Sequence, residues 1–209
     1  MRLKLLIRIR TAAVLTLLIF ACPFSVWAQS RDNPQRDEWQ KPDEVVQRLN
    51  LKPGDVIADI GAGRGYFTWR FAQTVGPEGK ALGLEIDPRL VEEMTKEAER
   101  LTLKNYVARL VQPDDPGLEA KSVDIAFLCN AYHHLQSRAD YFKRLAPALK
   151  PNGRVVIIDF YKKPLPVGPR DLHHKVSEET VKEELQKAGY RLSRSFDFLP
   201  YQYFLEFSP

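Results

Sequence analysis

The chain has 209 residues, which suits one ordinary domain with a short appendage, because single domains commonly run to about 100–200 residues. With 44% hydrophobic and 28% charged residues, its composition is globular and excludes a disordered chain, a repeat array and a collagen-like fibre. The formal net charge of +4 comes from basic residues within the first ten positions, and no basic run with interleaved aromatic residues follows residue 30. The electrostatic pattern of a nucleic-acid-binding surface is therefore missing, and we expect no nucleic-acid partner.

Residues 1–28 follow the pattern of a secretory signal peptide. Basic residues precede an apolar run over residues 12–21, and Val26 and Ala28 suit a peptidase that cuts before Gln29. We therefore expect the domain to be exported, to the periplasm in a bacterial envelope. An uncleaved segment of about 18 residues would instead anchor it facing outside, which is the one membrane contact we expect. A misassigned start codon would leave the domain cytoplasmic.

Residues 29–40 are polar and predict a linker, although Trp39 is expected to pack on the domain that follows over residues 41–209. Pro42 and the acidic residues after it predict a short helix that ends near Leu49. Cleavage of the signal would leave Cys129 as the one cysteine, which excludes an intrachain disulfide.

From residue 56 onward, short apolar runs rich in β-branched residues alternate with helical patterns. This alternation is typical of βαβ units, in which helices cover both faces of a parallel sheet. Asp87 and Ser177 occupy positions where their side chains can cap the helices that follow. The predicted strands are Val56–Ile60, Ala81–Ile86, Tyr106–Val111, Val123–Cys129 and Arg154–Phe160, and the predicted helices are Tyr66–Val75, Pro88–Leu101, Arg138–Leu149 and Ser177–Ala188.

Two β-rich runs end the chain, Tyr190–Phe198 and Tyr201–Phe207, with Leu199 and Pro200 between them. Strands joined so closely must be antiparallel, since a parallel crossover needs a dozen residues or more. We therefore predict an α/β fold with a Rossmann-like, doubly wound, seven-stranded sheet that is mostly parallel and has an antiparallel C-terminal hairpin.

The first predicted strand leads into the glycine-rich turn Asp59-Ile60-Gly61-Ala62-Gly63-Arg64-Gly65 and then into a helix. Glycines let the main chain approach a ligand closely, where a Cβ would collide or require an unfavourable φ. The helix adds N–H groups and the positive end of its dipole. Dinucleotide-binding enzymes share such a turn, but their fingerprint places a glycine where this chain has the bulky Tyr66.

The segment from Val56 to Tyr66 resembles the first motif of class I methyltransferases, which depend on S-adenosylmethionine (SAM). The antiparallel hairpin also fits that family, and the resemblance covers roughly residues 42–207. It implies SAM as the cofactor, with the acid Asp59 orienting the loop and the methionine ammonium. The residues of the implied cofactor turn are Asp59, Gly61, Ala62, Gly63, Gly65 and Tyr66.

Further acids complete the cofactor site that the resemblance implies. Glu85 ends the second strand 24 residues after Gly61, where a carboxylate can accept both ribose hydroxyls. Asp87 is the alternative for this role, but we expect its side chain to cap the helix that follows. After the third strand, Asp114 or Asp115 would receive the adenine amino group, and the sequence does not separate the two.

Polar residues follow the fourth strand, at the sheet edge where ligands of such folds bind. Asn130 is expected at the cofactor, and Tyr132, His133 and His134 are candidate catalytic residues. Methyl transfer needs an aligned acceptor within about 3–3.5 Å, and it needs a base only if the acceptor carries a proton. Either histidine could be that base, or could shape the pocket or cap the next helix.

All four histidines occur as two adjacent pairs, His133-His134 and His173-His174, in loops after neighbouring strands. Both pairs are expected at one cleft. Adjacent side chains point apart and Asp171 is the obvious nearby carboxylate, so we expect no metal and predict instead a lid over residues 162–175. Its Arg170 and His174, together with Tyr201 in the aromatic hairpin, are the predicted substrate-pocket residues.

The sequence thus predicts a SAM-dependent methyltransferase that acts on a small or lipid-like acceptor. The alternative is a non-catalytic SAM-binding or scaffold module of the cell envelope, which product formation would distinguish. A nicotinamide oxidoreductase is a third hypothesis, against which Tyr66 argues. Arsenite methylation does not suit a chain whose thiol ligands would come from Cys129 alone. No pattern identifies the acceptor atom or the oligomeric state.

Overall fold

The computed structural model describes residues 34–209, so the predicted signal peptide lies outside the described residues. Residues 34–40, predicted as part of a linker, instead form helix α1 (Pro34–Gln40). Its Trp39 ring lies 5.8 Å from the ring of Phe160, so this helix belongs to the folded domain. No helix within residues 34–209 is long and apolar enough to cross a membrane.

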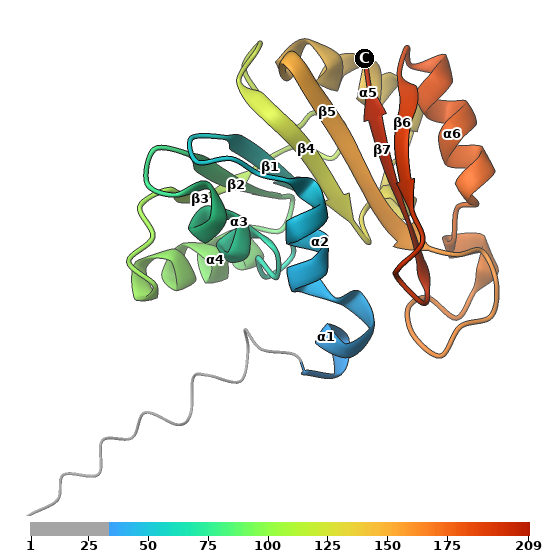
Figure 1. Cartoon of the computed structure of the whole chain (residues 1–209), viewed down its shortest axis with the longest axis horizontal. Helices are drawn as coiled ribbons and strands as arrows, with labels where there is room; N and C mark the ends of the chain where they lie inside the picture. The colour runs from blue at the N-terminus through green and yellow to red at the C-terminus, as the bar shows by residue number, and fades with distance from the viewer. Residues whose placement is uncertain (1–33) are drawn as a thin grey trace, which may run out of the picture.

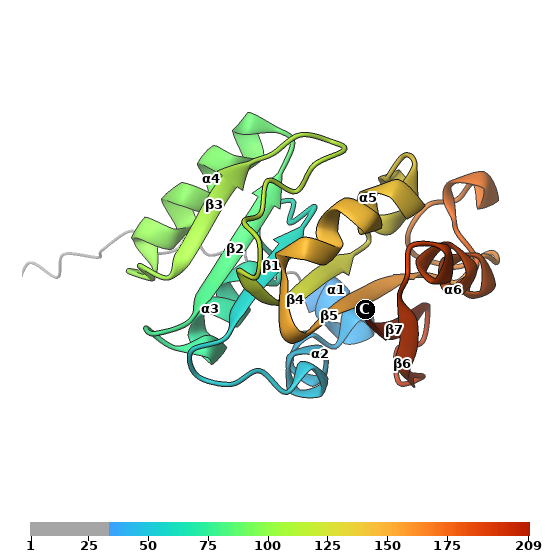
Figure 2. The same ribbon diagram turned by 90° about the horizontal axis from the view of Figure 1, so that it is seen from above.

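One sheet contains all seven strands and confirms the predicted fold class (Figures 1 and 2). The strands are β1 (Val56–Ile60), β2 (Lys80–Glu85), β3 (Tyr106–Leu110), β4 (Val123–Cys129), β5 (Leu149–Phe160), β6 (Arg191–Phe196) and β7 (Gln202–Ser208). Their order is β3-β2-β1-β4-β5-β7-β6, with β7 antiparallel to both of its neighbours. The fifth strand begins earlier than predicted because Leu149 already pairs with Val123.

Helices cover both faces of this sheet, as the βαβ pattern predicts. The further helices are α2 (Pro42–Leu49), α3 (Thr68–Val75), α4 (Pro88–Arg100), α5 (Arg138–Leu145) and α6 (Glu178–Lys187), with single turns η2 (Tyr132–His134), η3 (Ala146–Ala148) and η4 (Leu172–His174). Apolar side chains of α5 and α6 pack in one core layer, and those of α2, α3 and α4 pack in the other. Successive strand residues alternate between the two layers, so Ile157 faces the first and Ile158 the second.

Two of the helices begin at the predicted caps. The Asp87 carboxylate accepts a hydrogen bond of 2.9 Å from the Arg89 N–H, and the Ser177 hydroxyl accepts one of 3.2 Å from the Thr180 N–H. These bonds satisfy N–H groups that have no partner within the first turn of a helix, which is why short polar side chains start helices.

Several segments gather beside the carboxyl ends of β4 and β5. Figure 1 shows α1, the segment after β5 and the tip between β6 and β7 gathered there. Parallel strands send all their carboxyl ends to the same edge, so residues far apart in the sequence meet at this edge.

Candidate cofactor and acceptor site

The glycine turn leaves β1 in a backbone conformation that favours glycine. Gly61, Gly63 and Gly65 have φ angles of 69°, 59° and 75°. A Cβ on Gly61 would lie 2.7 Å from the Ala131 Cβ, and one on Gly65 would overlap the Tyr106 hydroxyl. A Cβ on Gly63 would meet nothing within 4 Å. The turn therefore packs closely against neighbouring residues at Gly61 and Gly65 and has open space at Gly63, as a main-chain cradle for a ligand requires.

Glu85 is buried at the end of β2 and holds this turn in place. One of its carboxylate oxygens accepts a hydrogen bond of 2.8 Å from the Gly63 N–H, and the other accepts one of 2.7 Å from the Ile86 N–H. The Asp87 carboxylate is bonded to the backbone and guanidinium of Arg89 instead. The structure therefore brings Glu85 to the turn, and it leaves the predicted ribose contact as a prediction.

Asp59 lies beneath the turn, with 3% of its surface exposed. The Thr68 hydroxyl donates a hydrogen bond of 2.6 Å to its carboxylate. Burial raises the pKa of Asp59 to about 7, although the Thr68 bond and the charge of Arg36 act in the opposite direction. A cationic ligand group beside Asp59 would favour its ionised form, which suits the ammonium contact that the family resemblance implies.

Helix α1 lies against the same turn. The sequence predicted the turn but not this helix. The Arg36 guanidinium is 3.7 Å from the centroid of the Tyr66 ring, and the Tyr66 hydroxyl donates a hydrogen bond to Asp37. Arg36 also opposes the effect of burial, which raises the pKa of Cys129 at the end of β4 to about 12. Pro34, as a helix-initiating residue, and the apolar Trp39 were the available signals for this helix.

Three amide side chains join α1, β4 and β7. Gln40 donates to Gln202, Gln202 donates to Asn130, and Asn130 donates to Gln40 over 3.4 Å. Asn130 has a φ of 58°, which asparagine tolerates better than most residues. Its amide is thus engaged with neighbouring elements, and its predicted cofactor contact stays a prediction.

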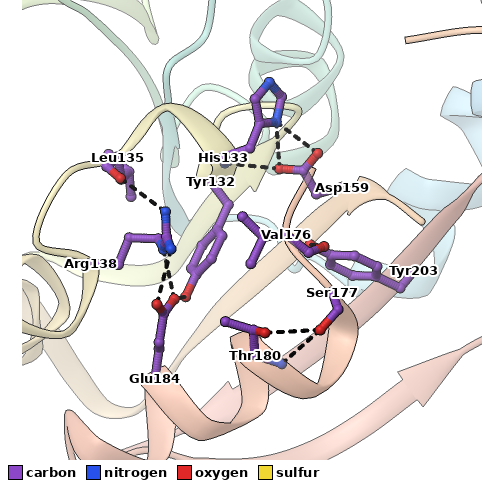
Figure 3. Close-up of polar contacts among 10 residues, drawn as sticks. All are labelled: Tyr132, His133, Leu135, Arg138, Asp159, Val176, Ser177, Thr180, Glu184 and Tyr203. Atoms are coloured by element: carbon purple, nitrogen blue, oxygen red, sulfur yellow. Dashed lines mark hydrogen bonds and ion pairs between the residues drawn. The ribbon is translucent and has the colours of Figure 1, made fainter. Parts of the chain in front are cut away.

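His133 is paired with a residue that the sequence analysis did not select. Its Nδ1 lies 2.9 Å from each carboxylate oxygen of Asp159, and its backbone N–H donates to the same carboxylate over 3.1 Å (Figure 3). Both side chains are nearly inaccessible, with 4% and 1% of their surfaces exposed. The position of Asp159 at the end of β5 was the one signal for this pair in the sequence.

His134 is more exposed than its neighbour His133. Its ring centroid is 4.0 Å from that of His133. Burial and the charge of His133 lower its pKa, and His174 adds to this effect while Asp159 and Glu85 oppose it. The charges of Glu85, at the end of β2, and of His174, in η4, thus both act on His134.

Tyr132 has a structural contact instead of the predicted catalytic position. Its ring is fully buried, and its hydroxyl donates a hydrogen bond of 2.6 Å to Glu184 on α6. Arg138 also donates to the Glu184 carboxylate, at 2.6 and 3.0 Å. Figure 3 shows the Tyr132 ring directed toward α6 and away from the His133 pair. This geometry argues against a catalytic Tyr132.

A cleft of about 620 Å³ opens between α1, the segment after β5 and the tip between β6 and β7. Its lining residues are Gln35, Arg36, Glu38, Trp39, Pro166, Val167, Pro200 and Tyr201. Tyr201 thus lies where a pocket residue was predicted, with its ring 6.5 Å from that of Trp39. Arg170 and His174 are exposed on the same segment but do not line this cleft.

The two acids after β3 are exposed. The Asp115 carboxylate accepts a hydrogen bond of 2.8 Å from the Gly117 N–H and so closes a local turn. The Asp114 carbonyl accepts one of 2.9 Å from Arg144. Which acid meets adenine stays open. Within residues 34–209, no group of three or more His, Cys, Asp or Glu side chains is placed to hold a metal ion.

Residues 51–196 match the protein family described as Methyltransferase domain. The chain belongs to the class I SAM-dependent methyltransferases. The crystal structure of a SAM-dependent methyltransferase from Aquifex aeolicus is similar with a TM-score of 0.79 and 26% identity, over 84% of this chain and 93% of that one. The main-chain cradle, Glu85 and Asp59 fit SAM, the cofactor of this family.

Curated relatives of this methyltransferase differ in what they act on. Aklanonic acid methyltransferase DauC of Streptomyces sp. (strain C5) is 31% identical over 102 residues, which cover 49% of this chain and 46% of DauC. A tRNA U34 carboxymethyltransferase of Klebsiella pneumoniae is 31% identical over 139 residues, covering 65% of this chain and 40% of that protein. The chain spans about half the length of such relatives or less, and their names do not determine its acceptor.

Proposed function

We propose that this methyltransferase transfers the methyl group of SAM to a small, largely apolar acceptor that binds in the cleft beside α1. The cleft carries the proposal. Its volume of about 620 Å³ is that of a small-molecule site, since such sites usually measure about 300–1,000 Å³. Two aromatic rings, Trp39 and Tyr201, and an apolar segment from Pro166 to Val167 line it, together with polar side chains of α1.

The position of the cleft relative to the glycine turn supports the same proposal. Arg36 lines the cleft and also stacks on Tyr66 at the turn, so the cleft and the cofactor residues share a border. SAM, when bound, supplies an electrophilic methyl group on a sulfonium. The turn, Asp59 and Glu85 would hold it, and the aromatic residues of the cleft would orient the acceptor and exclude water.

The test combines SAM binding to the full-length protein with its turnover of two probes that share a naphthalene ring, 2-naphthol and 2-naphthoate, measured as release of S-adenosylhomocysteine. Trp39→Ala should raise the KM for the probes about tenfold or more while leaving SAM affinity within about twofold, because one large apolar contact is lost. Leu192→Ala, which truncates an exposed residue on the edge strand β6, is the control. SAM that binds without any turnover across a broad acceptor panel would instead favour the non-catalytic module.

We also propose that the domain is exported. The basic and apolar pattern of residues 1–28 supports this, and those residues lie outside the described ones. Fusion of residues 1–35 to a reporter that is active only outside the cytoplasm tests it. An inactive reporter in the cytosol would overturn the proposal.

A further inference from the structure

We propose that His133 and Asp159 act as a general-base pair, and that the acceptor therefore carries a proton on the atom that is methylated, as a phenolic or alcoholic hydroxyl does. The inference rests on the proposed function, because it concerns the acceptor of the same site. His133 is the catalytic residue of the pair and Asp159 is its positioning residue.

The hydrogen bonds of Asp159 orient the imidazole of His133. The carboxylate meets Nδ1 at 2.9 Å from both oxygens and also accepts the backbone N–H of His133 at 3.1 Å. The Phe160 N–H donates a further bond of 2.8 Å. A carboxylate accepts but does not donate, so Nδ1 carries the proton in the neutral ring, and the lone pair that can accept a proton is on Nε2.

Nε2 is available to a ligand. Figure 3 shows this second ring nitrogen on the side of the imidazole away from Asp159. Within residues 34–209, the buried side-chain nitrogens and oxygens that lack a hydrogen bond include Tyr106 Oη and Arg109 Nε, and His133 Nε2 is not among them. The small exposed part of this side chain is therefore compatible with a base that a substrate can reach.

The pair lies at the carboxyl end of β4 and β5, the same sheet edge at which the glycine turn leaves β1. Asp159 directly precedes Phe160, whose ring is in contact with Trp39 of the cleft. The charges of Asp159 and Asp59 raise the pKa of Cys129, and the charge of Arg36 lowers it. The titratable groups on which the Asp159 charge acts include His134 beside the pair, Cys129 at the end of β4 and the Tyr203 phenol on β7, and Glu85 and His174 act on His134. A proton acceptor thus lies at the sheet edge where ligands of this fold bind.

The acceptor O–H proton passes to His133 Nε2 while the oxygen electron pair forms the bond to the methyl carbon. The carbon–sulfur bond breaks and its electron pair stays on sulfur, which gives the neutral thioether S-adenosylhomocysteine. Asp159 stabilises the imidazolium, which then loses its proton to water.

The two naphthalene probes separate base catalysis from general damage. At neutral pH, a phenolic hydroxyl with a pKa near 10 keeps its proton, whereas a carboxyl with a pKa near 4 has already lost it. His133→Gln should lower turnover of 2-naphthol by about 100- to 10,000-fold, the usual contribution of a general base, and change turnover of 2-naphthoate by less than about threefold. Leu192→Ala, at an exposed position on β6, is the control and should leave both rates unchanged.

Asp159→Asn should reduce 2-naphthol turnover selectively as well, with Asp140→Asn as its control on an exposed face of α5. SAM titration of each variant verifies that the site is still formed. A measurement on the unaltered protein does not depend on how the variants fold: at saturating SAM, turnover of 2-naphthol should fall more steeply on acidification than turnover of 2-naphthoate, because only the phenol needs a base.

Equal losses for both probes in His133→Gln, or pH profiles that coincide, would overturn the base assignment while leaving the proposed function intact. Methylation of 2-naphthoate but not of 2-naphthol by the unaltered protein would overturn the protic acceptor. A failure to methylate either probe would contradict the proposed apolar acceptor itself, and the inference would fall with it.

Discussion

Asp59 is a buried carboxyl that opposes folding at neutral pH and suits a cationic ligand. Its ordinary pKa is near 4, and burial raises it to about 7 in the folded chain. Between these two values the folded chain holds a proton that the unfolded chain has lost, so the contribution of Asp59 to stability falls as pH rises through this window. Above about pH 7 the ionised group is buried with the Thr68 hydroxyl as its hydrogen-bond donor.

Asp59→Asn should therefore stabilise the SAM-free protein at pH 8, by about 1–3 kcal/mol, while it weakens SAM binding at least tenfold. The amide oxygen still accepts from Thr68, so the change removes mainly the buried charge. Thermal denaturation at pH 8 and pH 4.5 measures the effect, and the gain should nearly disappear at the lower pH. A gain of equal size at both values would mean that the raised pKa of Asp59 is not its cause.

At the scale of elements, a side chain in the glycine turn would destabilise the protein in two ways, through backbone strain at positive φ and through steric overlap. Gly63→Ala forces a side chain into a positive φ with open space around it, whereas Gly65→Ala adds an overlap with the Tyr106 hydroxyl. We expect the first change to destabilise the protein by about 1 kcal/mol and the second by about 2–4 kcal/mol. Urea denaturation of the two variants provides the comparison, each being the control for the other. Equal losses would show that Tyr106 moves aside without cost.

The hydrogen bonds of Tyr132, Arg138 and Glu184 join η2 and α5 to α6. Burial acts against the charge of Glu184, but bonds from Arg138 and Tyr132 hold its pKa below the usual value. A lowered carboxyl pKa contributes stability above the unfolded pKa, and this contribution is lost as pH falls through the folded value. The role of these bonds is thus to hold the helices that carry the loop after β4.

Tyr132→Phe tests this structural role. The ring stays in the core while one hydrogen bond to a charged group is lost, so unfolding should become easier by about 1.5–3 kcal/mol. Methyl transfer by the folded enzyme should stay within about threefold of the original rate. A loss of a hundredfold or more at a temperature where the variant is folded would restore Tyr132 as a catalytic residue.

At the scale of the whole molecule, α1, the end of β4 and β7 are joined by side-chain contacts beside the glycine turn, and we expect SAM to bind there. SAM bound by these parts should stabilise the whole fold, by about 2.7 kcal/mol when SAM is present at about 100 times its Kd. A protein of this size should then melt about 5–10 °C higher. Differential scanning calorimetry at several SAM concentrations tests this, with ATP, which lacks the methionine part, as the control ligand. Equal shifts for both ligands would contradict a site that recognises methionine.

The sequence by itself determined the features that depend on short-range chemistry. Helix caps at Asp87 and Ser177, the glycine turn and the alternation of strands and helices follow from allowed backbone angles and from periodic burial, which a few neighbouring residues express. The antiparallel hairpin followed from a connection too short to cross the sheet. These local rules were sufficient for the fold class and for placing Asp59 and Glu85 beside the turn, and the resemblance of residues 56–66 to a known motif indicated the SAM family.

The tertiary structure alone decided which distant side chains meet. His133 and Asp159 are 26 positions apart, and Gln40 and Gln202 are 162 apart. Their contacts depend on the order of β4, β5 and β7 in the sheet and on which face each side chain takes. The same geometry directs Tyr132 toward α6 and places α1 against the turn. The order of residues in the sequence predicts neither contact, because the packing of the whole domain sets how side chains are oriented at a sheet edge.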